Sequence, residues 1–156
     1  MPKFIDIDKI VEILEEYYPV HIMEKQYSGH PYKVLVACIL SLRTRDETTF
    51  PVAEKLFSIA DTPEKIVKLP IDKLKQIIKS INYYETKAEN IHSLSKIIIE
   101  KYNGKVPSTI EELMEFRGVG RKTANVVLST GFNIPAIAVD THVHKIANRL
   151  GYVNTK

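Results

Sequence analysis

The sequence predicts an all-α protein, a compact array of several helices joined by short connections. Apolar residues recur at helical spacing through most of the 156 residues, and recognisable start and stop signals bound these stretches. No segment of the sequence alternates polar and apolar residues convincingly. The hydrophobic share of 44% is ample for a core, so we expect one domain, or one domain with a fragment of another.

The first predicted helices cover residues 7–18, 31–42 and 46–58. Pro31 suits the first turn of the second helix, which is apolar almost all round and is therefore expected near the centre of the fold. Cys38 lies in this helix and is expected to be a buried, small hydrophobic residue. As the only cysteine of the sequence, it excludes an internal disulfide.

The later helices are marked mainly by residues that favour helix ends, such as Thr62 before Pro63 and the pair Asn103-Gly104. One helix is expected to start near residue 63, and the next two are expected to cover residues 69–80 and 85–102. A helical hairpin is expected over 109–130, with Ser108 or Thr109 as its capping residue. A last helix, capped by Asp140 or Thr141, is expected to run to Leu150. Residues 137–139 are expected to be extended.

The net charge of +3 becomes informative when it is mapped along the chain. Residues 115–156 hold six Lys or Arg side chains and two acidic ones, whereas the rest of the chain holds 16 basic and 17 acidic side chains. This asymmetry indicates a polyanionic partner, although a solvated basic face is the simpler alternative.

No apolar run approaches the length of about 18 residues that a membrane-spanning helix needs, so no membrane partner is expected. Residues 1–8 are mixed and acidic, unlike a signal peptide. A single cysteine is typical of cytoplasmic proteins, and abundant Ile, Lys and Glu are typical of thermophiles.

A Gly-Val-Gly turn at residues 118–120 joins the two helices of the predicted hairpin. Gly118 and Gly120 can adopt positive φ and let another backbone approach, and Val119 is expected to pack inward. Because the first amides of a helix lack intrahelical partners, the turn predicts an anion site at the start of the second helix. The alternative is an ordinary helix connection with a glycine C-cap.

Four segments together resemble the endonuclease III branch of the helix-hairpin-helix DNA glycosylases, over residues 35–150. They are Ile39-Leu40-Ser41 with Thr44-Arg45-Asp46, then Tyr84 to Ile91, then Gly118 to Leu128 with its Gly-Val-Gly-Arg-Lys, and finally Ile137-Ala138-Val139-Asp140-Thr141-His142. The resemblance implies a six-helix domain over 25–136 with the hairpin at 109–130, residues 1–24 as the N-terminal helix of an incomplete second domain, and residues 137–156 as the start of its C-terminal part.

The resemblance also implies a prokaryotic, nucleoid-associated, monomeric base-excision-repair enzyme that acts on double-stranded DNA, removes damaged bases and cleaves at the abasic site. Lys122 matches the family's catalytic lysine and Asp140 its catalytic aspartate. The DNA-binding residues it implies are Gly118, Val119, Gly120, Arg121, Thr123, Lys87 and His142. Arg43 stands where the family usually has glutamine and Tyr83 where it usually has leucine, and these two are the candidates to fill the gap left by an extruded nucleotide.

The chemistry of the two proposed catalytic residues can be argued from the residue types. A neutral amine can attack the sugar C1′ and form a Schiff base, which permits β-elimination, and a carboxylate can stabilise positive charge on the sugar or accept the amine's proton. The simpler alternatives are a phosphate contact for Lys122 and a helix cap for Asp140.

Endonuclease III relatives usually end with four cysteines that hold an iron–sulfur cluster, and these cysteines are absent here. We therefore expect no cofactor in this chain, no metal site in its histidine spacing, and a truncation that leaves residues 1–20 with an exposed apolar face. A cation held by hairpin carbonyls is a further implication of the resemblance.

The sequence leaves three alternatives open, which concern the reaction, the presence of catalysis and the lesion. A monofunctional glycosylase acting on mismatches or uracil is the nearest alternative, although its branch generally lacks a lysine at this position. A non-catalytic helix-hairpin-helix DNA-binding module would explain the turn but not Asp140. Oxidised pyrimidines are the family's usual lesions, but the sequence does not select the lesion or the opposite base.

Overall fold

The computed structural model describes residues 6–18 and 20–156, and every regular element in this part of the chain is helical, which confirms the predicted fold class. The helices are α1 Ile7–Tyr17, α2 Ile22–Tyr27, α3 Pro31–Ser41, α4 Asp46–Ile59, α5 Pro63–Lys68, α6 Ile71–Ile77, α7 Tyr84–Tyr102, α8 Ile110–Met114, α9 Arg121–Val126, the π-helical η1 Val127–Gly131 and α10 Thr141–Arg149. None of these helices combines the length and apolarity needed to span a bilayer.

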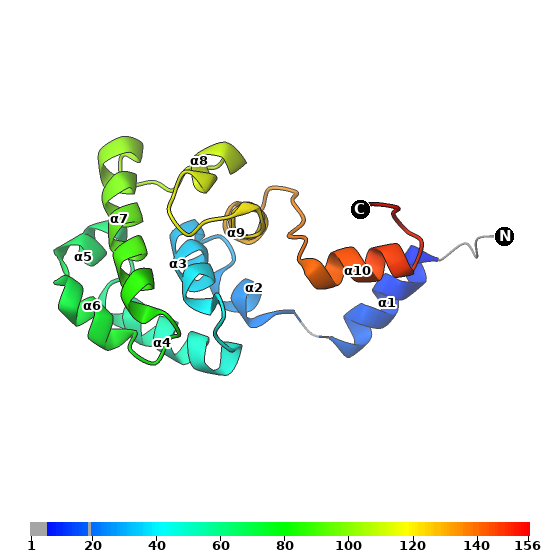
Figure 1. Ribbon diagram of the computed structural model, residues 1–156, viewed down its shortest axis with the longest axis horizontal. Coiled ribbons are helices and arrows are strands. Elements are labelled where there is room, and N and C mark those ends of the chain that lie inside the picture. The colour runs from blue at the N-terminus through cyan, green and yellow to red at the C-terminus, as the bar shows by residue number, and fades with distance from the viewer. Residues whose placement is uncertain (1–5, 19) are drawn as a thin grey trace.

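Helix α3 lies at the centre of the fold, as its uniformly apolar sequence predicts (Figure 1). It contacts α2, α4, α7, α9 and η1, and residues Val34 to Leu40 are all buried. Pro31 opens the helix, where its missing N–H costs no intrahelical bond. The burial of Cys38, 7% exposed, agrees with its predicted role as a small core residue.

The structure selects one capping residue where the sequence left two candidates. The Thr109 hydroxyl accepts from the Glu112 amide at 3.3 Å and caps α8, and the Asp140 carboxylate accepts from the Val143 amide at 2.8 Å and caps α10. Helix α7 ends at Asn103, which adopts the left-handed conformation with a φ of +52°. The predicted start and stop signals therefore set these ends to within a residue or two.

Two features differ from the expected helix pattern. Helix α2 was not expected, and it begins with the His21 ring accepting from the Met23 amide. Residues 25–136 contain the seven α-helices α3 to α9, one more than the predicted six, and α2 crosses the expected boundary at residue 24. The second hairpin helix continues from α9 into η1, where Gly131 is required because an added Cβ would lie 2.7 Å from the Pro31 Cα.

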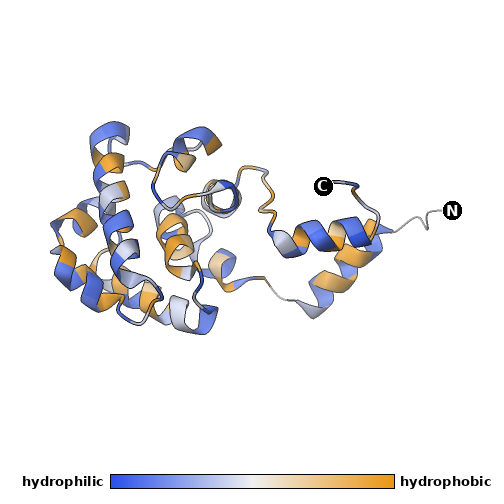
Figure 2. Ribbon diagram, viewed as in Figure 1, coloured by the Kyte–Doolittle hydropathy of each residue, from blue (hydrophilic) through white to orange (hydrophobic). Residues whose placement is uncertain are grey.

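Helices α1 and α10 lie at the same end of the molecule in Figure 1, away from the group formed by α2 to η1, and the C-terminal residues are on this side. Neither α1 nor α10 has a buried residue. Orange apolar positions lie on both helices in Figure 2. The exposed large apolar residues of this end are Val11, Ile13, Leu14, Tyr17, Tyr18, Ile137, Val139, Val143, Ile146, Leu150 and Tyr152. The apolar face expected for residues 1–20 is thus exposed in their described part; residues 1–5 and 19 lie outside it.

Candidate functional site

The hairpin turn depends on Gly118 but not on Gly120 for its backbone geometry. Gly118 has a φ of +85°, and a Cβ there would lie 2.9 Å from the Asn90 side-chain nitrogen. Gly120 is extended, with φ −96° and ψ −178°, so this glycine does not use the positive φ that is open to it. An added Cβ at Gly120 would have no protein atom within 4 Å, which leaves the start of α9 open to approach from outside.

The start of α9 is built as the sequence predicts for an anion site. Gly120 is the N-cap residue and has no side chain with which to cap the helix, so the first amides of α9 stay available to a ligand. Val119 is 6% exposed, and its amide donates to the Phe116 carbonyl. Its side chain therefore anchors the turn in the core, and only its carbonyl is left for a ligand.

Lys122 and Asp140 come together from two different helix starts. Lys122 stands in the first turn of α9 and Asp140 caps α10, and the Lys122 Nζ lies 3.7 Å from an Asp140 Oδ. The two side chains are 58% and 34% exposed, so both are accessible to a ligand. The hydrogen bond from the Val143 amide, together with the positive charges of Lys122 and His142, lowers the pKa of Asp140, which keeps it ionised at neutral pH.

A cleft with a volume of about 360 Å³ opens beside Lys122. Its walls are formed by His21, Met23, Cys38, Ser41, Leu42, Asp46, Lys122, Thr123 and Val126. Thr123, one of the predicted DNA-binding residues, is 7% exposed and forms part of this wall. Burial raises the pKa of the Cys38 thiol to about 12, so at neutral pH it is not a thiolate.

His21 and Asp46 are site residues that the sequence did not single out as a pair. The His21 Nε2 lies 3.0 Å from an Asp46 Oδ, and both side chains are more than half exposed at the edge of the cleft. They are separated by 25 positions, and one lies before α2 while the other opens α4. No local sequence signal links them.

The two candidate gap-filling residues lie side by side although 40 positions separate them. The guanidinium carbon of Arg43 is 5.9 Å from the centre of the Tyr83 ring, within the range of a cation–π contact. Both residues are left-handed, with φ of +54° and +57°, and both are exposed, Tyr83 by 64%. The structure therefore brings together the two side chains that the resemblance matched separately.

Lys87, one of the predicted DNA-binding residues, differs from the others because its ammonium points into the protein. Lys87 is 6% exposed, and its Nζ donates to the carbonyls of Leu40 and Leu42 and to the Thr44 hydroxyl. Burial lowers the pKa of Lys87 to about 8. Lys87 thus belongs to the support of the site and not to its surface.

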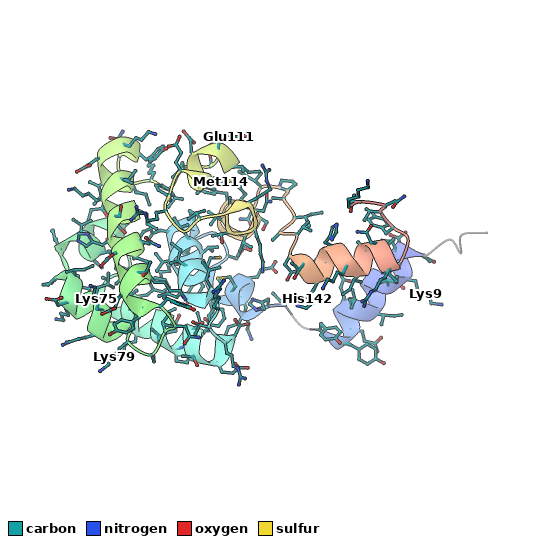
Figure 3. The ribbon with its side chains drawn as sticks, in the orientation of Figure 1. Lys9, Lys75, Lys79, Glu111, Met114 and His142 are labelled. Carbon is teal, nitrogen blue, oxygen red and sulfur yellow. The ribbon has the colours of Figure 1, made fainter. Side chains whose placement is uncertain are left out.

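Arg121 and His142 are exposed, as expected for residues that contact a ligand. Arg121 opens α9 beside the free amides, and Figure 3 marks His142 at the start of α10, two residues after Asp140. Both therefore lie at the helix starts that carry Lys122 and Asp140. The positive charge of Arg121 adds to the anion-binding character of this surface.

Within the described residues, no group of three His, Cys, Asp or Glu side chains could hold a metal ion. A four-cysteine iron–sulfur cluster does not fit this chain, because its sequence has one cysteine and that cysteine is buried in α3.

The amino-acid sequence of the chain matches a known protein family. Residues 36–156 match the model of the HhH-GPD superfamily base excision DNA repair protein. Endonuclease III of Thermotoga maritima is 51% identical over 126 residues, which cover 81% of this chain and 59% of that protein. Endonuclease III of Haemophilus influenzae is 45% identical over 148 residues, covering 95% of this chain and 70% of that one.

The fold agrees with the sequence comparison. A trapped covalent intermediate of endonuclease III with DNA, an estranged-adenine complex, superposes with a TM-score of 0.80 at 41% identity, covering 93% of this chain and 67% of that one. The present chain thus spans little more than half the length of the Thermotoga relative and about two thirds of the solved structure. With the hairpin, the central helix and the match over most of its length, the chain belongs to the HhH-GPD superfamily of base excision DNA repair proteins, in its endonuclease III branch.

Proposed function

We propose that this chain is a base-excision-repair DNA glycosylase with lyase activity at abasic sites, and that Lys122 and Asp140 are its catalytic residues. The observation that carries the proposal is the 3.7 Å approach of the Lys122 amine to the Asp140 carboxylate at the edge of an open cleft. An amine and a carboxylate so placed can both reach one sugar carbon.

Double-stranded DNA with a damaged base or an abasic site is the proposed substrate, bound by a monomer. The open start of α9 offers backbone amides to a phosphate, and the exposed Arg121 adds a positive charge beside them. A base inside the duplex cannot reach Lys122, so the nucleotide has to be extruded, and the cleft beside Lys122 is the proposed place for the extruded base.

Lys122 then acts as nucleophile through the lone pair of its neutral amine. Its Nζ bonds to C1′ while the glycosidic bond breaks, and the base leaves with the bonding electrons and takes up a proton. Opening of the sugar ring converts the new bond into a protonated Schiff base. Removal of a proton from C2′ expels the 3′ phosphate oxygen, which cleaves the strand, and water then hydrolyses the imine and restores the lysine.

Asp140 contributes a negative charge that is present throughout this sequence. Because its lowered pKa keeps it ionised, it can stabilise the positive charge that develops on the sugar as the base departs. The carboxylate also lies close enough to the Lys122 amine to act as the acceptor of its proton. Capping of α10 fixes its position, so the capping role and the catalytic role are compatible.

Oxidised pyrimidines are the proposed lesions. The edge of the cleft presents the His21–Asp46 pair and the Ser41 hydroxyl, which supply both donors and acceptors to a base edge. Arg43 and Tyr83 are the proposed residues that occupy the gap left in the duplex, the arginine by hydrogen bonding to the orphaned base and the tyrosine by stacking.

The test compares wild type, Lys122→Ala and the control Lys96→Ala, which changes an exposed lysine on α7. A duplex that carries thymine glycol is incubated with each protein, and strand cleavage is measured with and without later alkali, which separates base release from nicking. We expect Lys122→Ala to lose nicking entirely while its circular dichroism stays unchanged, and Lys96→Ala to behave as wild type. Nicking by Lys122→Ala at the wild-type rate would contradict the mechanism.

The same assay separates the alternative functions. Base release without nicking by the wild type would indicate a monofunctional glycosylase. Salt-dependent binding to the duplex without either reaction would indicate a DNA-binding module.

A further inference from the structure

Two short loops meet at the Arg43–Tyr83 pair, and both are held in an unfavourable backbone conformation. Arg43 follows the end of α3 and Tyr83 precedes α7, and each is a non-glycine residue in the left-handed region. The Cβ of a non-glycine residue is crowded by the following carbonyl oxygen in this conformation, so each of the two residues is strained. Such residues persist only where the surrounding contacts determine their geometry, and they gather at functional sites.

The contact beneath the two loops is the ammonium of Lys87. Lys87 stands in the first turn of α7, where its amide donates to the Tyr83 carbonyl at 3.0 Å. Its side chain reaches back across to α3, and its three protons meet three acceptors, the carbonyls of Leu40 and Leu42 and the Thr44 hydroxyl. One residue thus bonds to Tyr83 through its backbone and to both sides of Arg43 through its side chain.

Asn82 closes the same network from the other loop. Its side-chain amide donates to the Arg43 carbonyl, and its backbone amide donates to the Thr44 hydroxyl at 3.2 Å. The Thr44 hydroxyl is therefore shared between Asn82 and Lys87. Apart from the bond to the Leu40 carbonyl in α3, the side-chain contacts of this network join residues 42–44 to Lys87 of α7 or to Asn82, just before Tyr83.

We propose that Lys87 is a positioning residue that joins the loop carrying Arg43 to the loop carrying Tyr83, so that the two side chains enter DNA as one preorganised unit. The proposal rests on the proposed function, because it presumes that a nucleotide is extruded from a duplex. Without the ammonium, three acceptors lose their donor, and each loop can relax toward an unstrained conformation. The pair would then have to be ordered at the moment of binding, which slows extrusion.

This role predicts a dependence on the second DNA strand. In a duplex, the pair has to fill the gap and meet the orphaned base, whereas in a single strand there is no gap and no orphaned base. Loss of Lys87 should therefore slow the reaction on duplex DNA selectively. A residue that serves only general stability would affect both substrates alike.

The experiment measures single-turnover borohydride trapping on an abasic site, in duplex and in single-stranded DNA of the same sequence. Lys87→Met keeps the length of the side chain and removes the charge. Lys75→Met is the matched control, since Lys75 lies on α6 and its ammonium pairs with Glu89 of α7 at 3.4 Å. We expect Lys87→Met to slow duplex trapping roughly ten- to hundredfold, as a misplaced binding group does, with the single-strand rate and both Lys75→Met rates within about twofold of wild type.

Equal slowing of Lys87→Met on both substrates, or no slowing on either, would overturn the proposal. If Lys87→Met does not fold by circular dichroism, Thr44→Val gives the same test, because it removes the shared acceptor at constant side-chain volume. An unchanged ratio of duplex to single-strand rates in Thr44→Val would equally overturn the role.

A second arm separates this inference from the proposed function. If wild type traps neither substrate, the lyase proposal fails, and the positioning role is then read from binding alone. The probe is a duplex with a tetrahydrofuran abasic analogue opposite 2-aminopurine, whose fluorescence rises when it is unstacked. We expect saturating wild type and Lys75→Met to raise the fluorescence and Lys87→Met to leave it low, and equal fluorescence in all three would contradict the role of Lys87.

Discussion

The two ends of this molecule are stabilised very differently. In the region from α2 to η1, each helix has at least one buried residue, and α3 exposes almost nothing between Val34 and Leu40. At the other end, α1 and α10 bury no residue at all, although both carry apolar side chains (Figure 2). The proposed catalytic pair spans this difference, because Lys122 belongs to the packed region and Asp140 to the exposed end.

Packing of the protein core preorganises only one of the two proposed catalytic residues, Lys122. The turn that presents Lys122 is anchored by the buried Val119 and by Gly118 against Asn90. Asp140 is held by its own helix cap and by the approach of Lys122, with no buried neighbour on α10. We therefore expect stability to depend on the first region, and catalysis to depend equally on both.

The largest expected effect on stability distinguishes the two regions directly. Leu35→Ala removes a fully buried side chain from α3 and should lower the free energy of unfolding by about 2–5 kcal/mol. Ile146→Ala, on α10, removes a side chain that is 54% exposed and should change it by about 0.5 kcal/mol or less. Urea titration of both variants measures the contrast, and similar losses would show that α10 packs as firmly as α3.

Asp140→Asn removes the negative charge of the Lys122–Asp140 pair and should leave the fold unchanged. Asparagine also caps helices, so the bond from the Val143 amide survives and only the charge is lost. We expect base release to slow about a hundredfold with unchanged thermal unfolding, as when one preorganised electrostatic group is removed. Single-turnover excision kinetics provide the measurement, and an unchanged rate would leave Asp140 with its capping role alone.

The two hairpin glycines allow a matched test within the packed region. Gly118→Ala places a Cβ at positive φ and 2.9 Å from the Asn90 side chain, and should cost about 1–3 kcal/mol of stability. Gly120→Ala meets no protein atom and should leave stability unchanged, but it should weaken DNA binding because the added methyl stands at the open start of α9. Thermal unfolding and fluorescence anisotropy on duplex DNA separate the two; equal losses of stability would contradict the account of the turn.

A further contrast is the pH dependence of stability contributed by Lys87. Its pKa of about 8 in the folded protein lies below the ordinary lysine value of 10.5, so the unfolded chain binds more protons between these pH values. The stability of wild type relative to Lys87→Met should therefore be constant below about pH 8 and rise from there to about pH 10.5. Urea titrations across this range measure it, and a relative stability that falls as pH rises would contradict the burial of the ammonium.

Much of the fold follows from local signals in the sequence. The all-α class, the central position of α3, the caps Thr109 and Asp140 and the inward side chain of Val119 all depend on residues within one or two turns of each other. Local sequence signals do not predict helix α2, because the helix is short and begins with His21, which is not a common capping residue.

The features that sequence reasoning missed depend on contacts between distant segments. In the sequence, Lys87 resembles an ordinary surface lysine of a helix. In the folded protein the end of α3, more than 40 positions earlier in the chain, lies beside it and supplies the carbonyls to which its ammonium donates. The His21–Asp46 pair arises in the same way. In both cases the residue type is visible in the sequence, but its partner is set by how helices that are distant in the sequence pack.

The most direct test of the central claim is to locate the covalent bond to DNA. Wild-type protein is mixed with a duplex that contains an abasic site, reduced with borohydride and digested, and the modified peptide is identified by mass spectrometry. The account predicts a single adduct on the Lys122 amine that is absent in Lys122→Ala. An adduct on another amine that persists in Lys122→Ala, or no adduct despite saturating binding, would contradict it.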